Sequence, residues 1–356
     1  MFDSYFCALI FTIFLMILLK IMVFNNNTLN KVQKNKFKSI STLILITSIS
    51  EWLGVFLNGK PLWTRPFHIL VKTLELSLAP IIPMLCADII KKPKHKKAIT
   101  LICILLSSLE ILSAFTGLIF KVSTHNVYEH SNFYWIYIAS FTVGVLYFIY
   151  ATITESKNQF GFNRILILML PFFLLLGLIF QYLGNDVHII WLCVAINMIL
   201  MYTMYIEFTQ NLDSLTHTLN RKYYENTLAR LSKPSTIFFF DVNDFKSIND
   251  TYGHVYGDTT LARVGETLIS VFVSYGECFR IGGDEFCAIV ESTTINPELF
   301  IQKLEMKTEK IRKDDPRFPF IAVGYAKYHP NDNVDAIIEK ADQMMYTYKE
   351  KIKSQT

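Results

Sequence analysis

The sequence predicts two parts of different fold class: an all-α transmembrane bundle over residues 1–208 and an α+β domain over residues 209–356. Hydrophobic residues make up 52% of the 356 residues and charged residues only 18%, which is more apolar than an ordinary soluble protein. The long apolar stretches all lie before residue 209. After Phe208 the chain becomes charged, and strand-like and helix-like segments alternate, which indicates a sheet covered by helices.

Seven apolar stretches of the first part are long enough, at about 20 residues, to cross a membrane as helices. Pro80 and Pro83 should kink the third stretch. The first stretch has no basic region before it and no small-residue cleavage site after it, so it is interpreted as a retained helix and not a signal peptide. The seven stretches are Tyr5–Phe24, Ile40–Leu57, Phe67–Ile90, Ala98–Phe120, Phe133–Ile153, Ile165–Leu183 and Val187–Phe208.

Positive charges gather in alternate loops between these stretches. Because Lys and Arg are retained on the cytoplasmic side, the odd-numbered loops should be inside, the N-terminus outside and the second part in the cytoplasm. The chain is therefore expected to be a multi-pass protein of the cell membrane, in contact with the lipid bilayer. Its net charge of +4 is too small to indicate a nucleic-acid partner. The positive loop residues are Lys31, Lys34, Lys36 and Lys38 in loop one, "KKPKHKK" in loop three, and Lys157 and Arg164 in loop five.

The ionisable residues Glu51, Lys72, Glu75 and Glu110 lie within the stretches, where charge is costly and often functional. Lys72 and Glu75 are three residues apart on one helical face and could neutralise each other. Glu51 and Glu110 have no such partner nearby in sequence; they could line a ligand pocket or reach water at the membrane surface. No loop is long enough to form an extracellular domain, so an unidentified signal ligand should be read within the bilayer or at its outer rim.

The second part shows the pattern of a mostly antiparallel sheet flanked by helices. Gly282 and Gly283 lie between two apolar runs and predict a two-residue hairpin turn of the primed type, where glycine adopts positive φ at no cost. The residues Phe208, Leu212, Leu215 and Leu219 could continue the last helix as a short coiled-coil seam or could pack in the domain core. The other predicted segments are helices over 222–231, 259–272, 297–313 and 333–351, and strands over 235–243 and 318–328.

Acidic residues follow the strand over 235–243, which is apolar on both faces and therefore central. If its end lies beside the hairpin tip, Asp241, Asp244, Asp284 and Glu285 crowd together, and so many like charges need a cation. Hard oxygen ligands select Mg2+ or Mn2+. Alternation along a strand points Asp284 and Glu285 to opposite faces, which favours one main ligand from that pair. The alternative is an ordinary hairpin whose tip is acidic.

Four motifs in this part resemble the successive signatures of the GGDEF domain of diguanylate cyclases, and the resemblance covers essentially all of Asp213 to Lys353. The resemblance implies a nucleotide-cyclase or palm-like fold that condenses two GTP molecules into cyclic di-GMP and releases two pyrophosphates. Each such domain holds one GTP, so the active form should be a homodimer. The motifs are "DSLTHTLNR" (213–221), "FFFDVNDFKSINDTYGHVYGD" (238–258), "RIGGDEF" (280–286) and "KADQMMYTYK" (340–349).

The same resemblance implies roles for individual residues. It makes Asp241, the Val242 carbonyl and Asp284 metal ligands, with Glu285 as a second acidic contributor and Asp284 as the candidate base. Lys353 stands where the family has an arginine, so a charge is kept but the forked geometry is lost. His254 could contact substrate or be structural. The residues implied for substrate are Asp244, Phe245, Lys246 and Lys349 with Lys353 for the phosphates, and Asn249 and Asp258, with His254 between them, for guanine.

One family feature is missing and two alternatives remain. Many members carry an RxxD sequence nine residues before the first glycine of the hairpin, where a product dimer binds and inhibits the enzyme; here those residues are "VSYG", Val273 to Gly276, which predicts no product-inhibition site. The domain could instead be an inactive module that binds GTP or cyclic di-GMP as a regulatory receptor. A changed nucleotide choice is the other alternative, although Asp258 is the residue expected for guanine.

Overall fold

The computed structural model describes residues 2–90, 96–158, 164–183 and 189–354, which fall into two compact units that divide near Ile206. Most of the "KKPKHKK" segment and the "GND" segment at 184–186, on which part of the predicted orientation depends, lie outside the described residues. The side chain of Lys353 also lies outside them.

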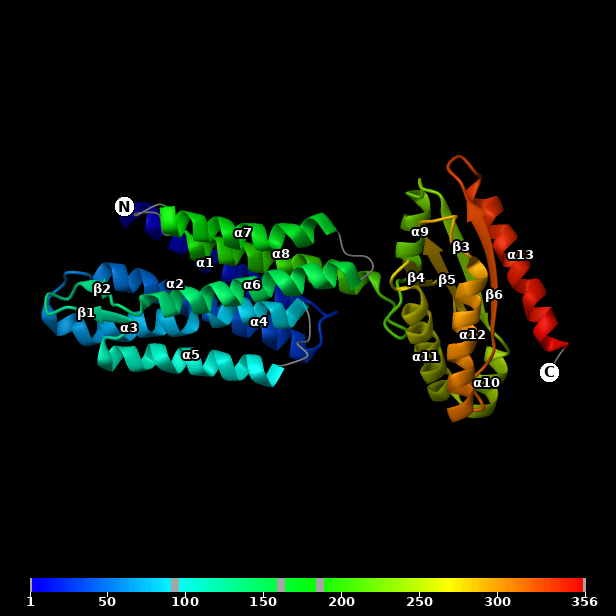
Figure 1. Ribbon diagram of the computed structural model, residues 1–356, viewed down its shortest axis with the longest axis horizontal. Helices are drawn as coiled ribbons and strands as arrows, with labels where there is room; N and C mark the ends of the chain where they lie inside the picture. Colours follow the sequence, from blue (N-terminus) through cyan, green and yellow to red (C-terminus); the bar gives the residue numbers. More distant parts are fainter. Residues whose placement is uncertain (1, 91–95, 159–163, 184–188, 355–356) are drawn as a thin grey trace. The chain divides into compact units, whose positions relative to one another are not determined.

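The first unit is helical, and each of the seven predicted stretches coincides with helix (Figure 1). Five segments are long and apolar enough to cross a membrane: Tyr5–Asn25, Lys31–Leu57, Leu62–Ile90, Tyr134–Thr154 and Ile190–Asn211. The described apolar part of α5, Ile104–Thr116, is shorter than a span. The helices are α1 (Phe2–Asn25), α2 (Lys31–Leu57), α3 (Arg65–Leu78), α4 (Ile81–Ile90), α5 (Lys96–Thr116), α6 (Tyr134–Asn158), α7 (Arg164–Leu183) and α8 (Ile190–Asn211).

The third and fourth stretches show one success and one error of the sequence reasoning. The predicted kink is confirmed, because α3 ends at Leu78 and α4 begins at Ile81, on either side of Pro80. The fourth helix was predicted to reach Phe120, but it ends at Thr116. Gly117 follows with a φ of 68°, the left-handed conformation that commonly ends a helix. The chain then forms an antiparallel hairpin of β1 (Phe120–Val122) and β2 (Tyr128–His130).

The second unit is a four-stranded antiparallel sheet of order β4-β5-β3-β6 with helices on both faces, which confirms the predicted α+β class (Figure 1). The central position of β3 is also confirmed: Phe238 and Phe240 pack with α11 and α12, and Ile237 and Phe239 pack with α9 and α13. The strands are β3 (Ser235–Val242), β4 (Gly276–Arg280), β5 (Glu285–Val290) and β6 (Ile321–Tyr328). The helices are α9 (Arg221–Ala229), α10 (Phe245–Tyr252), α11 (His254–Phe272), α12 (Pro297–Asp314) and α13 (Val334–Lys353).

The predicted primed turn between β4 and β5 is wrong. Strand β4 ends at Arg280 and β5 begins at Glu285, so four residues connect the strands, and neither Gly282 nor Gly283 has the left-handed φ that a primed turn requires. A Cβ on Gly282 would lie 2.5 Å from a carboxylate oxygen of Glu285, so a larger residue there would displace that side chain. The Arg280 guanidinium shapes the connection by donating to the Gly283 carbonyl at 2.8 and 3.2 Å.

The leucines after α8 pack inside the second unit. Helix α8 ends at Asn211, so the described backbone does not continue it as a coiled-coil seam. Leu219 is buried in the core beneath α9 and α13, and Leu215 packs against the core beneath α11 and α12. Of the two sequence-based alternatives, core packing is therefore the one observed.

Two strand glycines let other backbone approach closely. A Cβ on Gly324 of β6 would overlap the Ala341 carbonyl oxygen and the Met345 nitrogen, so α13 lies directly on the strand at this point. A Cβ on Gly276, the first residue of β4, would overlap the carbonyl oxygen of Ile289 in β5. Neither position tolerates a side chain without backbone movement.

Candidate functional site

Carboxylates gather where β3 ends beside the β4–β5 connection. Asp241 and Glu285 are direct cross-strand partners. The N–H of Val242 donates to the carbonyl of Asp284 at 3.2 Å, which holds this residue at the same strand end. The antiparallel pairing of β3 with β5 thus brings together three of the predicted acidic residues from positions more than 40 apart in sequence.

The electrostatics of this cluster favour a cation. Partial burial and the negative charges of Asp284, Asp241 and Asp342 raise the pKa of Glu285 above its usual value. Carboxylate and carbonyl oxygens are the donors that Mg2+ and Mn2+ prefer, so the residues present fit such an ion. Among the described residues, however, no three His, Cys, Asp or Glu side chains already converge as ligands. The cationic group in contact with Asp241 is instead the ammonium of Lys349.

Lys349 reaches the cluster from α13. Its Nζ donates to Asp241 Oδ1 at 2.5 Å, and the close approach of α13 to β6 at Gly324 makes this contact possible. Sequence reasoning assigned Lys349 to the triphosphate but missed Asp342, which faces Glu285 from the same helix. The signal was available, because residues seven apart lie on one helical face and Asp342 precedes Lys349 by seven.

A second group of predicted residues lies at the corner between α10 and α11. Asp244 has a left-handed φ of 51° and precedes α10 without a side-chain capping bond, so no cap from this residue satisfies the first N–H groups of the helix. Phe245 and Lys246 begin α10, a helix that sequence reasoning missed. Lys246 is exposed and Phe245 half-buried.

Helices α10 and α11 contact each other at Gly257. The Asn249 side chain lies where a Cβ on Gly257 would be, so this amide is held against α11 directly beside Asp258. Asp258 and His254 are exposed on the first two turns of α11. Asn249 and Asp258 therefore lie near each other, at the corner where the helices form an open polar surface.

Arg280 fastens the β4–β5 connection to the start of the second unit. Its Nη1 lies 3.1 Å from Asp213 Oδ1, which also accepts hydrogen bonds from the backbone N–H and the hydroxyl of Thr216 at 2.9 and 2.7 Å. Burial opposes ionisation of Asp213, but these hydrogen bonds and the guanidinium hold its pKa below the usual value. By binding both Asp213 and the Gly283 carbonyl, Arg280 helps to hold the connection that carries Asp284 and Glu285.

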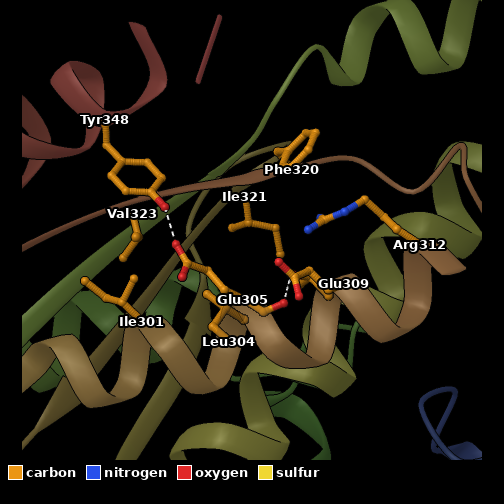
Figure 2. A pocket seen from close by; sticks show the side chains of 10 residues that line it. Ile301, Leu304, Glu305, Glu309, Arg312, Phe320, Ile321, Val323 and Tyr348 are labelled. Atoms are coloured by element: carbon orange, nitrogen blue, oxygen red, sulfur yellow. Dashed lines mark hydrogen bonds between the residues drawn. The ribbon is translucent and has the colours of Figure 1, made fainter. Parts of the chain in front are cut away.

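A separate cavity of about 340 Å³ lies between α12, β6 and α13 (Figure 2). Figure 2 shows the Tyr348 hydroxyl pointing at Glu305, to which it donates at 2.5 Å, and Arg312 beside Phe320, 4.1 Å from the ring centre. None of the predicted site residues lines this cavity. The lining residues are Ile301, Leu304, Glu305, Thr308, Glu309, Arg312, Phe320, Ile321, Val323 and Tyr348.

Comparison with known proteins identifies relatives of this part of the chain. The family model described as "Diguanylate cyclase, GGDEF domain" matches residues 210–355. The probable diguanylate cyclase DgcI of Escherichia coli K12 is 40% identical over 105 residues, which are 29% of this chain and 23% of that protein. Diguanylate cyclase DgcS of Shewanella oneidensis is 30% identical over 144 residues, 38% of this chain and 49% of that protein. The chain thus spans less than half of the length of these relatives.

A solved structure also matches. The GGDEF domain of DgcB from Caulobacter crescentus, in complex with c-di-GMP, is 23% identical with a TM-score of 0.36, and the match covers 39% of this chain and 90% of that one.

Proposed function

Because residues 210–355 belong to the GGDEF family of diguanylate cyclases, we propose that this protein condenses two GTP molecules into cyclic di-GMP and two pyrophosphates under control of its helical first unit. The observation that carries the proposal is the meeting of Asp241, Asp284 and Glu285 at one strand end, next to the uncapped N-terminus of α10. The carboxylates at this strand end can bind a metal ion or accept a proton. The first backbone N–H groups of α10 can bind phosphate oxygens.

The reaction begins with attack of a ribose 3′-hydroxyl on the α-phosphate of the second nucleotide. Asp241, the Val242 carbonyl, Asp284 and Glu285 would hold Mg2+ or Mn2+, which supplies positive charge for the phosphoryl oxygens and makes the hydroxyl more acidic. Asp284 accepts the hydroxyl proton. Lys349, paired with Asp241 in the absence of substrate, can turn to the triphosphate and leave Asp241 free.

The corner between α10 and α11 binds the rest of the nucleotide. The first N–H groups of α10, at Asp244 and Phe245, with Lys246 beside them, receive phosphate oxygens. Asn249 and Asp258 pair with the guanine edge, where a carboxylate accepts from N1–H and the 2-amino group. Lys353 adds positive charge for the phosphates. His254 lies between Asn249 and Asp258 in the sequence and can contact the substrate.

Two copies of the domain must face each other, because each holds one GTP and each hydroxyl attacks the phosphate in the opposite copy. A C2 homodimer gives both hydroxyls equivalent access. The apolar helices of residues 1–208 would hold this dimer in the cell membrane, with the N-terminus outside and residues 209–356 in the cytoplasm. A signal ligand would bind the helical unit.

The alternative is an inactive GGDEF module that binds GTP or cyclic di-GMP as a regulatory receptor. The deciding experiment incubates the full chain in lipid nanodiscs with Mg2+ and labelled GTP, ATP or both, and separates the products. Cyclic di-GMP made from GTP alone supports the enzyme. Bound nucleotide without any cyclic product would identify the receptor.

Base recognition is tested in the same assay with the variant Asp258→Ser. Removal of the carboxylate should reduce the preference for GTP over ATP by at least tenfold, because an unpaired acceptor is what penalises the wrong base. Asp250→Asn, which changes an exposed acid on α10, is the matched control. Unchanged selectivity in Asp258→Ser would assign guanine recognition to other residues.

A further inference from the structure

An open groove of about 460 Å³ lies between α1 and α2 of the first unit, near the helix ends that residues 26–30 connect. Lys38 and Thr42 of α2, four residues apart, line one side of it. The four lining residues of α1 follow i, i+3, i+4, i+7 spacing and therefore share one helical face. They are Ile17, Lys20, Ile21 and Phe24.

The walls of this groove are mostly apolar, yet they are not covered by the protein. Ile17 and Ile21 are half-exposed, and Phe24 is 70% exposed. Both helices are long and apolar enough to cross a membrane. Exposed apolar surface of this kind marks a place where a membrane or another apolar partner lies against the protein.

Lys20 and Lys38 add two positive charges to the apolar walls. The Nζ of Lys38 lies 5.4 Å from the ring centre of Phe24, a cation–π contact that holds the ammonium over the groove. Among the described residues no Asp or Glu lines the groove. In the sequence, residues 4–50 contain five lysines and no acid. The groove therefore carries positive charge that its own walls do not neutralise.

Lys36 shows the contrast on the same segment of α2. Its Nζ lies 2.9 Å from Asp88 Oδ2 of α4 and donates to the Asp88 carbonyl at 2.9 Å. The protein thus supplies an anion for Lys36. For Lys20 and Lys38, the lining of the groove contains no such group within the described part of the chain.

The two ammonium groups lie at a depth that suits a lipid headgroup. Lys20 is five residues before Asn25, the end of α1, and Lys38 is seven residues after Lys31, the start of α2. These separations correspond to roughly 7 to 11 Å along the helices. From such a depth a lysine can extend its ammonium to the headgroup layer while its stem stays among acyl chains. Lys34 adds positive charge at the helix ends, where its Nζ donates to the Phe24 carbonyl at 3.3 Å.

We propose that this groove binds one phospholipid with a net negative headgroup. An acyl chain lies against Ile17, Ile21 and Phe24, and the headgroup phosphate accepts hydrogen bonds from Lys20 and Lys38. A zwitterionic headgroup brings its own cation, which the lysines repel. A free phosphate ion would match the lysines but leave the apolar wall uncovered. The orientation given under the proposed function places the groove in the cytoplasmic leaflet, where anionic lipids gather.

The same ends of α1 and α2 also contact α8, the helix that leads into the second unit. The Tyr202 hydroxyl donates to the Met22 carbonyl of α1 at 3.1 Å, and the Tyr205 hydroxyl accepts from the Gln33 amide of α2 at 2.5 Å. A lipid that bridges α1 and α2 would fix the surface on which this end of α8 rests. Lipid composition would then be an input to synthesis; that control rests on the proposed function, but binding of the lipid does not.

The test is native mass spectrometry of the full chain in detergent, titrated with dioleoylphosphatidylglycerol or dioleoylphosphatidylcholine, which share their acyl chains. The first phosphatidylglycerol should bind the wild type at least tenfold more tightly than phosphatidylcholine. Lys20→Gln combined with Lys38→Gln should weaken phosphatidylglycerol binding at least tenfold and leave phosphatidylcholine binding unchanged. The matched control is Lys60→Gln combined with Lys121→Gln, which removes two positive charges outside the groove and should keep the preference.

Equal binding of the two lipids by the wild type would overturn the proposal, and so would a preference that survives in the Lys20/Lys38 variant. A third arm adds glycerol 1-phosphate: displacement of phosphatidylglycerol at equal concentration would assign a site for free phosphate and refute the lipid. If the double variant does not fold, Lys20→Gln alone and the wild-type comparison still decide.

The outcome is separable from that of the proposed function. Selective phosphatidylglycerol binding by a chain that makes no cyclic di-GMP in any lipid would refute the proposed function and leave this site standing. Synthesis of cyclic di-GMP by a chain without lipid preference would do the reverse.

Discussion

Both units place a lysine against an acid, but the two ion pairs are built differently. Lys72 and Glu75 are three residues apart on one helix, 8% and 11% exposed, and enclosed by Gly54 and Tyr128. Lys349 and Asp241 are 108 residues apart, 23% and 13% exposed, and lie at an open strand end beside other carboxylates. The enclosed pair is held in one place by the residues around it, whereas the open pair can exchange either partner for a ligand. The same chemistry is thus structural in one unit and available for catalysis in the other.

The largest expected effect breaks the open cluster. Asp284→Asn should reduce cyclic di-GMP synthesis at least tenfold, equivalent to about 1.4 kcal/mol of barrier, because it removes the carboxylate that the proposed function assigns to metal binding and proton transfer without changing shape. The measurement is the initial rate with saturating GTP and Mg2+. Asp314→Asn, at an exposed position on α12, is the control. A variant that keeps more than about a tenth of the wild-type rate would show that Asp284 is not essential.

The next effect breaks the enclosed pair. Lys72→Met should destabilise the first unit by about 3–5 kcal/mol, because it removes the cation of a buried ion pair and leaves the Glu75 carboxylate buried without that charge. Tryptophan fluorescence during denaturation reports this unit alone, since all four tryptophans, Trp52, Trp63, Trp135 and Trp191, precede residue 207.

Two further variants sharpen that result. Lys72→Met combined with Glu75→Gln should recover much of the loss, because the double variant buries neither charge of the pair. Lys121→Met, which breaks the exposed pair with Glu129, should cost less than about 1 kcal/mol. An equal loss in the free energy of unfolding for Lys72→Met and Lys121→Met would mean that burial does not increase the contribution of the Lys72–Glu75 pair to stability.

A smaller effect concerns the glycine that brings Lys349 to Asp241. Gly324→Ala should cost about 1–3 kcal/mol, because the new methyl group overlaps the backbone of α13 and pushes the helix outward. Hydrogen exchange of α13 amides in the full chain should become faster. Gly283→Ala is the matched control, since a Cβ there meets open space. Unchanged exchange in α13 after Gly324→Ala would contradict the close approach described above.

The smallest effect is a pH dependence of the open cluster. The raised pKa of Glu285 means that the folded state binds this proton more tightly than the unfolded state. Its contribution to stability therefore declines as pH rises from the ordinary range of a glutamate, near 4.3, through the raised folded pKa. Glu285→Gln should flatten that decline in calorimetry with EDTA present. Glu291→Gln, an exposed acid paired with Lys233, should not.

The sequence predicted those elements whose patterns are long. The strand β3 has an apolar run from Ile237 to Phe240 that covers both faces, and each predicted membrane stretch is apolar over about 20 residues, so both were found. The hairpin β1–β2 was missed because three-residue strands cannot show an alternation. Helix α10 was missed because "FKSINDTY" is short and polar and begins at a left-handed aspartate.

The sequence indicated which residues belong to the candidate site, but it did not indicate which of their side chains are in contact. Asp241, Asp284 and Glu285 could be grouped because a central strand must end beside its hairpin neighbour. The pairing of Lys349 with Asp241 depends on how closely α13 approaches β6, and a single glycine sets that distance. Two adjacent glycines likewise allow a primed turn without requiring one, and in the structure neither has a left-handed φ.

Gly276, the first residue of β4, limits which substitutions the strand can accept at this position. It ends the "VSYG" segment, at the position where the resemblance to the GGDEF family implies the aspartate of a product-binding pair, and a Cβ there would overlap the carbonyl oxygen of Ile289. An aspartate introduced by one codon change would have to force β4 and β5 apart. A product-binding aspartate at position 276 would therefore require a change in the pairing of β4 with β5 as well as the substitution itself. The close approach of Ile289 thus makes this site of feedback inhibition hard to acquire by a single mutation.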